Sequence, residues 1–231
     1  ALIIALKIYK KSGYPKLFKI LSVHEWQKLI VTNTNIFLRS LILEIVIISY
    51  VFFGSTLGTV ILAANHVLFQ FVHITSYALD GFAFSAETLV GTAYGEKSQT
   101  KIRAASTKST IWALVCAIFI TLLLVVFSKK LIELMVVDEV IQSASKEFCF
   151  WITITPITGF LSFMLDGIFI GATKARFMRK AMIQSVIVYF VSMCFLFPIF
   201  ENHGLWASIN IFFIARAIFL LRYYPAVENF K

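Results

Sequence analysis

Long apolar runs separated by short polar or basic segments make up most of this sequence. A membrane-spanning helix needs about 20 apolar residues to cross about 30 Å of hydrocarbon. Measured against that length, the pattern predicts six spans, at residues 36–57, 60–94, 111–127, 148–172, 181–200 and 205–221. The second run is too long for one straight span, so we expect this helix to tilt, to project from the bilayer or to bend at Gly81.

The composition agrees with a membrane location. Of the 231 residues 59% are hydrophobic and only 14% are charged, whereas an ordinary soluble domain has about 25% charged residues. We therefore predict an all-α integral membrane protein with a bundle of six transmembrane helices. The sequence shows no nucleophile paired with a base, and no cysteine or histidine spacing typical of a metal site, so we expect neither an enzyme nor a bound cofactor.

The basic residues indicate topology rather than nucleic-acid binding, although the net charge is +9. They occur in short clusters between the apolar runs, and 16 of the 21 fall in alternate loops on one side, against three on the other. The positive-inside rule places the richer side, with both ends of this chain, in the cytoplasm of a multi-pass inner-membrane protein. Arg39 and Arg216 lie within predicted spans, and we expect both side chains to snorkel to the cytoplasmic boundary.

The first 33 residues form a region of their own. The sequence begins with Ala1 rather than methionine, and "ALIIALKIYKK" is typical of the end of an apolar helix followed by a basic loop. We expect residues 1–33 to comprise the end of a preceding helix and a cytoplasmic amphipathic connector, broken at Pro15. Residues 34–231 would then form the six-helix transmembrane lobe, within a protein that begins before Ala1.

Two acidic residues stand inside the second predicted span, in the stretch "SYALDGFAFSAETLVG". An ionised residue at mid-bilayer costs roughly 2.5–3.5 kcal/mol, and such residues face a bundle interior or a watery cavity. Asp80 and Glu87 are seven residues apart, which puts them on one face of the helix. The same stripe contains His66, His73 and Tyr94, of which we interpret the histidines as interhelical hydrogen-bonding groups or residues of the external mouth rather than ligands.

Two further spans each carry one carboxylate. Glu44 lies about 14 Å beyond the cytoplasmic edge of the first span, Glu87 about 15 Å, and Asp166 about 12 Å. These depths raise the hypothesis that the three carboxylates converge near the midplane, with Asp80 about 10 Å closer to the outside. A simpler interpretation remains open, in which a single acidic residue only hydrogen-bonds a neighbouring helix.

Three segments resemble those of one transporter family. The string "ANHVLFQFVHITSYALDGFAFSAETLVGTAYGEKS" resembles the eighth helix of MATE-type multidrug and toxin extrusion transporters, especially the branch called DNA-damage-inducible protein F. "FMLDGIFIGATKARFMRKAM" and "NIFLRSLILE" resemble the tenth and seventh helices of this family. The resemblance covers essentially the whole chain, as the second of two six-helix lobes.

The resemblance implies an antiporter with a V-shaped cavity between two lobes, which exports cationic or amphipathic compounds in exchange for H⁺ or Na⁺. Glu44 and Asp166 look like the residues that act in cation binding in other branches. Together with the two acidic residues of the second span, the candidate binding residues are Glu87, Asp80, Asp166 and Glu44. The implied partners are an N-terminal six-helix lobe, the lipid bilayer and an organic cation or amphipathic substrate. Two alternatives remain, a lipid-linked polysaccharide flippase of the same superfamily and a non-transporting membrane fragment.

Overall fold

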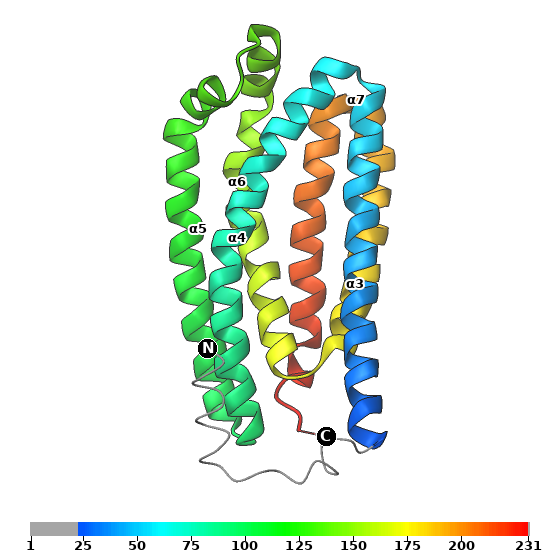
Figure 1. Ribbon diagram of the computed structural model, residues 1–231, viewed down its shortest axis with the longest axis vertical. Coiled ribbons are helices and arrows are strands. Elements are labelled where there is room, and N and C mark those ends of the chain that lie inside the picture. Colours follow the sequence, from blue (N-terminus) through cyan, green and yellow to red (C-terminus); the bar gives the residue numbers. More distant parts are fainter. Residues whose placement is uncertain (1–22, 231) are drawn as a thin grey trace, which may run out of the picture.

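Helices account for nearly all of the computed structural model, which describes residues 23–230 (Figure 1). The elements in chain order are α3 (Val23–Thr56), α4 (Thr59–Gly95), α5 (Gln99–Met135), α6 (Glu139–Gly171), α7 (Ala175–Tyr223) and a short 3₁₀ turn, η1 (Tyr224–Ala226). All five α-helices are long and apolar enough to cross a membrane. The predicted all-α membrane fold is confirmed.

The sixth predicted pass comes from a break inside α7. Glu201 has non-helical backbone angles, φ 47° and ψ −121°, and Figure 1 shows the two parts of α7 running antiparallel, yellow-orange and orange-red. Gly204 allows the two parts to approach, because a Cβ there would run into the carbonyl oxygen of Leu196. The described residues therefore form six passes, one from each of α3–α6 and two from α7, with the reversal inside the predicted gap at residues 201–204.

The helices extend beyond the apolar runs that predicted them. The third run was expected at residues 111–127, whereas α5 covers Gln99–Met135, because its start is decided by capping: the Ser98 side chain accepts a hydrogen bond from the Lys101 amide. Similarly α3 includes residues 23–33, ahead of the span that was expected to begin near residue 34. The rest of the predicted connector, residues 1–22, lies outside the described residues.

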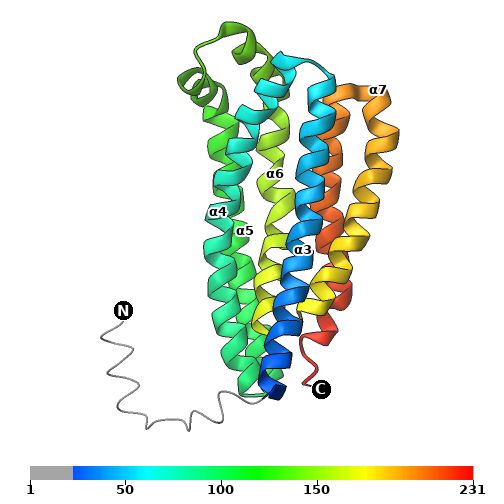
Figure 2. The ribbon, with the colours of Figure 1, turned by 45° about the vertical axis from the view of Figure 1, so that its right-hand side comes forward.

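The two ends of the bundle are distinct. The Gly58 end contains the α3–α4 turn, the α5–α6 connection and the break in α7, whereas the Lys97 end contains the α4–α5 and α6–α7 turns and η1 (Figures 1 and 2). The first half of α4 is inclined across the bundle, and its second half runs beside α5, which agrees with the expected tilt of this long helix.

The centre of the bundle is the contact between α4 and α6, the most extensive pair of elements. Gly167 and Gly171 of α6 make this contact close, because a Cβ at either position would collide with the backbone of α4, at the carbonyl oxygens of Ala83 and Glu87. Small residues commonly bring membrane helices together in this way. By contrast, α3 packs mainly against α7 and only slightly against α4, and it lies at one side of the bundle in Figure 1.

Candidate functional site

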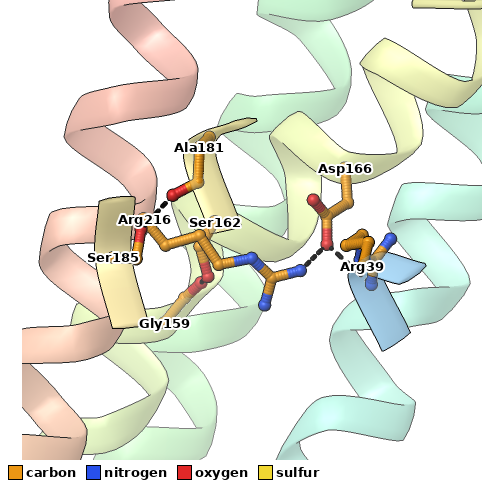
Figure 3. Close-up of polar contacts among 7 residues, drawn as sticks. All are labelled: Arg39, Gly159, Ser162, Asp166, Ala181, Ser185 and Arg216. Atoms are coloured by element: carbon orange, nitrogen blue, oxygen red, sulfur yellow. Dashed lines mark hydrogen bonds and ion pairs between the residues drawn. The ribbon is translucent and has the colours of Figure 1, made fainter. Parts of the chain in front are cut away.

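A buried aspartate on α6 holds two arginines from two other helices. Asp166 is only 7% exposed, and its Oδ2 accepts a hydrogen bond from Nη2 of Arg216, on the second part of α7. The same oxygen lies 3.1 Å from Nη2 of Arg39 on α3. Figure 3 shows the two guanidinium groups reaching Asp166 from opposite sides. Since α6 is not a main neighbour of α3, the long Arg39 side chain makes this link.

The expected snorkelling is wrong for Arg216. Arg216 is 2% exposed, and its guanidinium carbon lies 6.0 Å from the ring centre of Phe163, within range of a cation–π contact. A buried arginine is strongly disfavoured unless it is paired, and Asp166 supplies that pairing inside the bundle. Arg39 also turns inward to Asp166, although 16% of its side chain remains exposed.

Asp80 stands beside this group without touching it. It lies half-buried on α4 and interacts electrostatically with both Arg39 and Arg216, yet within residues 23–230 it makes neither a hydrogen bond nor a close ion pair. We call Asp80, Asp166, Arg39 and Arg216 the charged cluster. It contains two carboxylates and two guanidinium groups from four different passes, so its formal charges balance.

The predicted meeting of Glu44 with Asp166 is wrong. Glu44 is exposed, and it follows Arg39 by five residues, which places it about 140° around α3 from the arginine that faces Asp166. Glu87 is half-buried two turns beyond Asp80, and among residues 23–230 it has no ion pair with the cluster. The structure therefore brings together Asp80 and Asp166 but not Glu44 and Glu87.

The rest of the polar stripe on α4 is divided between the two ends of the bundle. His66 and His73 line a cavity near the Gly58 end. Tyr94 lies at the other end, where its ring contacts Phe230 and the ammonium group of Lys174. The stripe therefore runs from that cavity past the charged cluster to the Lys97 end.

The two arginines are the members of the site that sequence reasoning missed. The available signal was the presence of two arginines within spans, because these are natural counterions for aspartates within spans. The cluster also has unused hydrogen-bonding capacity. Asp166 Oδ1 and Arg39 Nε are buried without a hydrogen-bond partner in the described part of the chain.

This arrangement separates the chemical capacities of the two aspartates. Asp166 already shares one oxygen between two guanidinium groups, which occupy the position that a cation would take. Asp80 interacts with the two arginines electrostatically and without direct contact, so its carboxylate is available to a proton or another cation. Within residues 23–230, no group of three or more histidine, cysteine, aspartate or glutamate side chains is placed to hold a metal ion.

Comparisons with known proteins show which family this chain matches. The MatE family model matches residues 35–196. The chain is 32% identical over 224 residues to DNA damage-inducible protein F of Escherichia coli K12, and the match covers 95% of this chain and 48% of that protein.

Two solved structures share the fold. A MOP superfamily transporter from Pyrococcus furiosus, whose title reports a binding pocket of reverse polarity, has a TM-score of 0.75 at 14% identity, over 85% of this chain and 44% of that one. An outward-facing multidrug resistance MATE transporter has a TM-score of 0.72 at 15% identity, with the same coverages. The chain thus spans about half the length of these relatives. It belongs to the MATE family of membrane transporters.

Proposed function

We propose that this chain forms one six-pass half of a secondary active antiporter that exports cationic or amphipathic compounds in exchange for H⁺. Membership of a transporter family supports this function, as does the similarity to a protein described as a multidrug resistance transporter. The proposed partner is a second six-helix lobe, and the proposed orientation places the Lys97 end, with most of the basic residues, in the cytoplasm.

The observation that carries the proposal is the difference between the two aspartates. Asp166 is occupied by Arg39 and Arg216, whereas Asp80 is half-buried and makes no close ion pair within residues 23–230. Asp80 is therefore the carboxylate that can exchange its occupant. We assign the exchange of H⁺ to Asp80 and the electrostatic support of that exchange to Asp166 and the arginines.

Exchange follows from the charge balance of the cluster. With Asp80 ionised the cluster is neutral and Asp80 attracts a cationic substrate. A proton on Asp80 leaves the cluster with a net charge of about +1, which repels the same cation. Occupancy by H⁺ or by the substrate is then mutually exclusive, and exposure of the site to each side in turn couples their movements.

The test is proton-driven efflux from proteoliposomes that contain the two-lobe transporter. We expect Asp80→Asn to abolish rhodamine 6G efflux driven by a pH gradient while the protein remains folded and inserted. Glu44→Gln, which neutralises a carboxylate outside the cluster, is the matched control and should keep most of the efflux. If Asp80→Asn transports as the wild type does, or if a Na⁺ gradient alone drives efflux, the assignment is wrong.

A lipid-linked polysaccharide flippase is the second candidate, and the arginines favour it. The headgroup of such a lipid is anionic and needs cationic partners, and Arg39 keeps 16% of its side chain exposed. An assay of lipid flipping in the same proteoliposomes separates the two functions. Flipping that depends on Arg39, without dye efflux, would identify a flippase, and a lack of both activities would identify a non-transporting membrane protein.

A further inference from the structure

We propose that a pocket at the Lys97 end binds the headgroup of an acidic phospholipid that carries hydroxyl groups, such as phosphatidylglycerol. The inference goes beyond the proposed antiport and needs only a bilayer around the bundle. The pocket lies between α3 and the first turns of α7 and has a volume of about 360 Å³, within the range of about 300–1,000 Å³ typical of small-molecule sites. Its lining residues are Ile30, Val31, Thr34, Asn35, Arg176 and Arg179.

Two arginines give this pocket its charge. Arg176 is exposed and Arg179 is half-buried, and neither forms an ion pair or a side-chain hydrogen bond among residues 23–230. By contrast, Arg103 near the same end of the bundle is held by both carboxylate oxygens of Glu228. A guanidinium group binds phosphate oxygens through a pair of N–H donors. The pocket therefore offers two unpaired guanidinium groups to a phosphate.

A buried asparagine adds hydrogen-bonding capacity. Asn35 is 7% exposed, and its Nδ2 donates a hydrogen bond to the Val31 carbonyl oxygen at 2.6 Å. Its Oδ1 is buried without a partner in the described part of the chain, which is costly. A hydroxyl group of a bound molecule that reached this oxygen would remove the cost. The pocket therefore suits a phosphodiester that carries hydroxyl groups better than phosphate alone.

The surface beside the pocket suits the acyl chains of such a lipid. On α3, Phe37 follows Thr34 by three residues and is exposed. On α7, Ile183 and Ile187 follow Arg176 by seven and eleven residues, and both are exposed. Residues at these spacings share one face of a helix. Both helices run from the Lys97 end toward the Gly58 end (Figures 1 and 2), so these apolar side chains lie deeper in the bundle than the pocket, where a soluble anion would not use them.

Native mass spectrometry of the intact two-lobe transporter in detergent tests the proposal without any ion gradient. Titration with phosphatidylglycerol and with phosphatidylcholine of the same acyl chains separates the effect of the headgroup from that of the chains. We expect phosphatidylglycerol to bind at least about fivefold more tightly. A large excess of inorganic phosphate should leave the lipid bound, because phosphate has no acyl chains. Equal affinities for the two lipids, or displacement by phosphate, would overturn the proposal.

A matched pair of double variants separates this pocket from the general basic charge of the Lys97 end. Arg176→Gln with Arg179→Gln should lower the affinity for phosphatidylglycerol about tenfold. Lys108→Gln with Arg222→Gln also removes two exposed positive charges, outside the lining residues, and affinity should stay unchanged. Phosphatidylglycerol should also raise the Tm of the wild type and of the control, but not that of the first variant. Equal losses in the two double variants would contradict a defined site.

Phosphatidylmethanol tests the contact with Asn35, because it has the same phosphodiester without the hydroxyl groups. We expect it to bind the wild type about twofold to fivefold more weakly than phosphatidylglycerol. Asn35→Leu should remove this difference while keeping the preference for both acidic lipids over phosphatidylcholine. Equal binding of the two acidic lipids by the wild type would overturn the selection of hydroxyl groups by Asn35.

Discussion

The carboxylate of Asp166 and the guanidinium of Arg216 form an ion pair in which neither side chain is more than 10% exposed. The two residues are 50 positions apart in the sequence and lie on the fourth and sixth passes of the bundle. Their pairing changes the chemistry of the lobe. An aspartate that would be a simple cation site in isolation becomes one member of a balanced cluster, and Asp80 is left without a close ion pair among residues 23–230.

Removal of Arg216 should destabilise the protein strongly. Arg216→Met leaves the buried Asp166 with one guanidinium partner, and breaking a buried pair costs about 3–5 kcal/mol of unfolding free energy. Replacement of both partners, with Asp166→Leu added, should recover only part of the loss, because the apolar pair needs no counterion but Arg39 then loses its ion pair with Asp166. Thermal unfolding of the purified protein in detergent measures both effects. Wild-type stability of Arg216→Met would show that the pair is not formed.

The close contact of α4 and α6 predicts opposite effects for two glycine substitutions. Gly167→Ala places a methyl group against the Ala83 carbonyl oxygen, so the helices must separate, at a cost of about 1–3 kcal/mol. Gly81 has nothing within 4 Å of the position of a Cβ, so Gly81→Ala should stabilise α4 by up to about 1 kcal/mol. The free energy of unfolding of the two variants checks the prediction. Similar values for both would contradict the packing.

A buried amide network joins α4 to the second part of α7 at the Gly58 end. The Asn65 carboxamide oxygen accepts hydrogen bonds from Trp206 Nε1 at 2.9 Å and from Asn202 Nδ2 at 3.0 Å. Asn65→Leu would leave both donors unpaired, so we expect a loss of about 1–3 kcal/mol in unfolding free energy. Ser85→Ala is the control, because among residues 23–230 this exposed hydroxyl bonds only within its own helix, to the Gly81 carbonyl. Its loss should change the unfolding free energy by no more than about 0.5 kcal/mol.

The stability of residues 224–230, at the Lys97 end of the bundle, should decrease at low pH. Glu228 receives hydrogen bonds from Arg103 Nε and Nη2, both at 2.7 Å, and this bonding lowers the pKa of the Glu228 carboxyl below its ordinary value. A lowered pKa in the folded state gives a contribution that is complete above the ordinary glutamate pKa, near 4.5. It is lost as the pH falls through the lowered value. Hydrogen exchange of residues 224–230 at decreasing pH should show increased opening, and Glu228→Gln should show it already at pH 7.

The carboxylates of α4 and α6 should matter for transport in the intact parent transporter. We expect Glu87→Gln and Asp166→Asn to impair drug resistance while expression remains intact. The first substitution removes a charge from the polar stripe of α4, and the second removes a charge from the charged cluster. Resistance assays with parallel immunoblots measure both quantities. Normal resistance in both variants would favour a purely structural role for these side chains.

Much of the fold follows from local sequence features. The lengths of the apolar runs predicted six passes, and the gap between the runs at residues 181–200 and 205–221 placed the last reversal near Glu201, where the structure has its break. Helix ends were less predictable. They are set by caps such as Ser98 and Asp138 rather than by the last apolar residue. The relative depths expected from counting residues were wrong. Counting placed Asp166 nearly level with Glu87 and about 10 Å from Asp80, whereas the packing of Gly167 against Ala83 and of Gly171 against Glu87 brings Asp166 nearer the level of Asp80.

The sequence by itself thus determined the class of the protein, the number of passes and the presence of carboxylates inside them, since these depend on hydrophobicity and length alone. Only the tertiary structure decided that Asp166 lies between Arg39 and Arg216 and that Glu44 points away from them. The rotation of each helix about its axis depends on packing against its neighbours, such as the approach of Gly167 and Gly171 to α4. A residue count gives no information about that rotation.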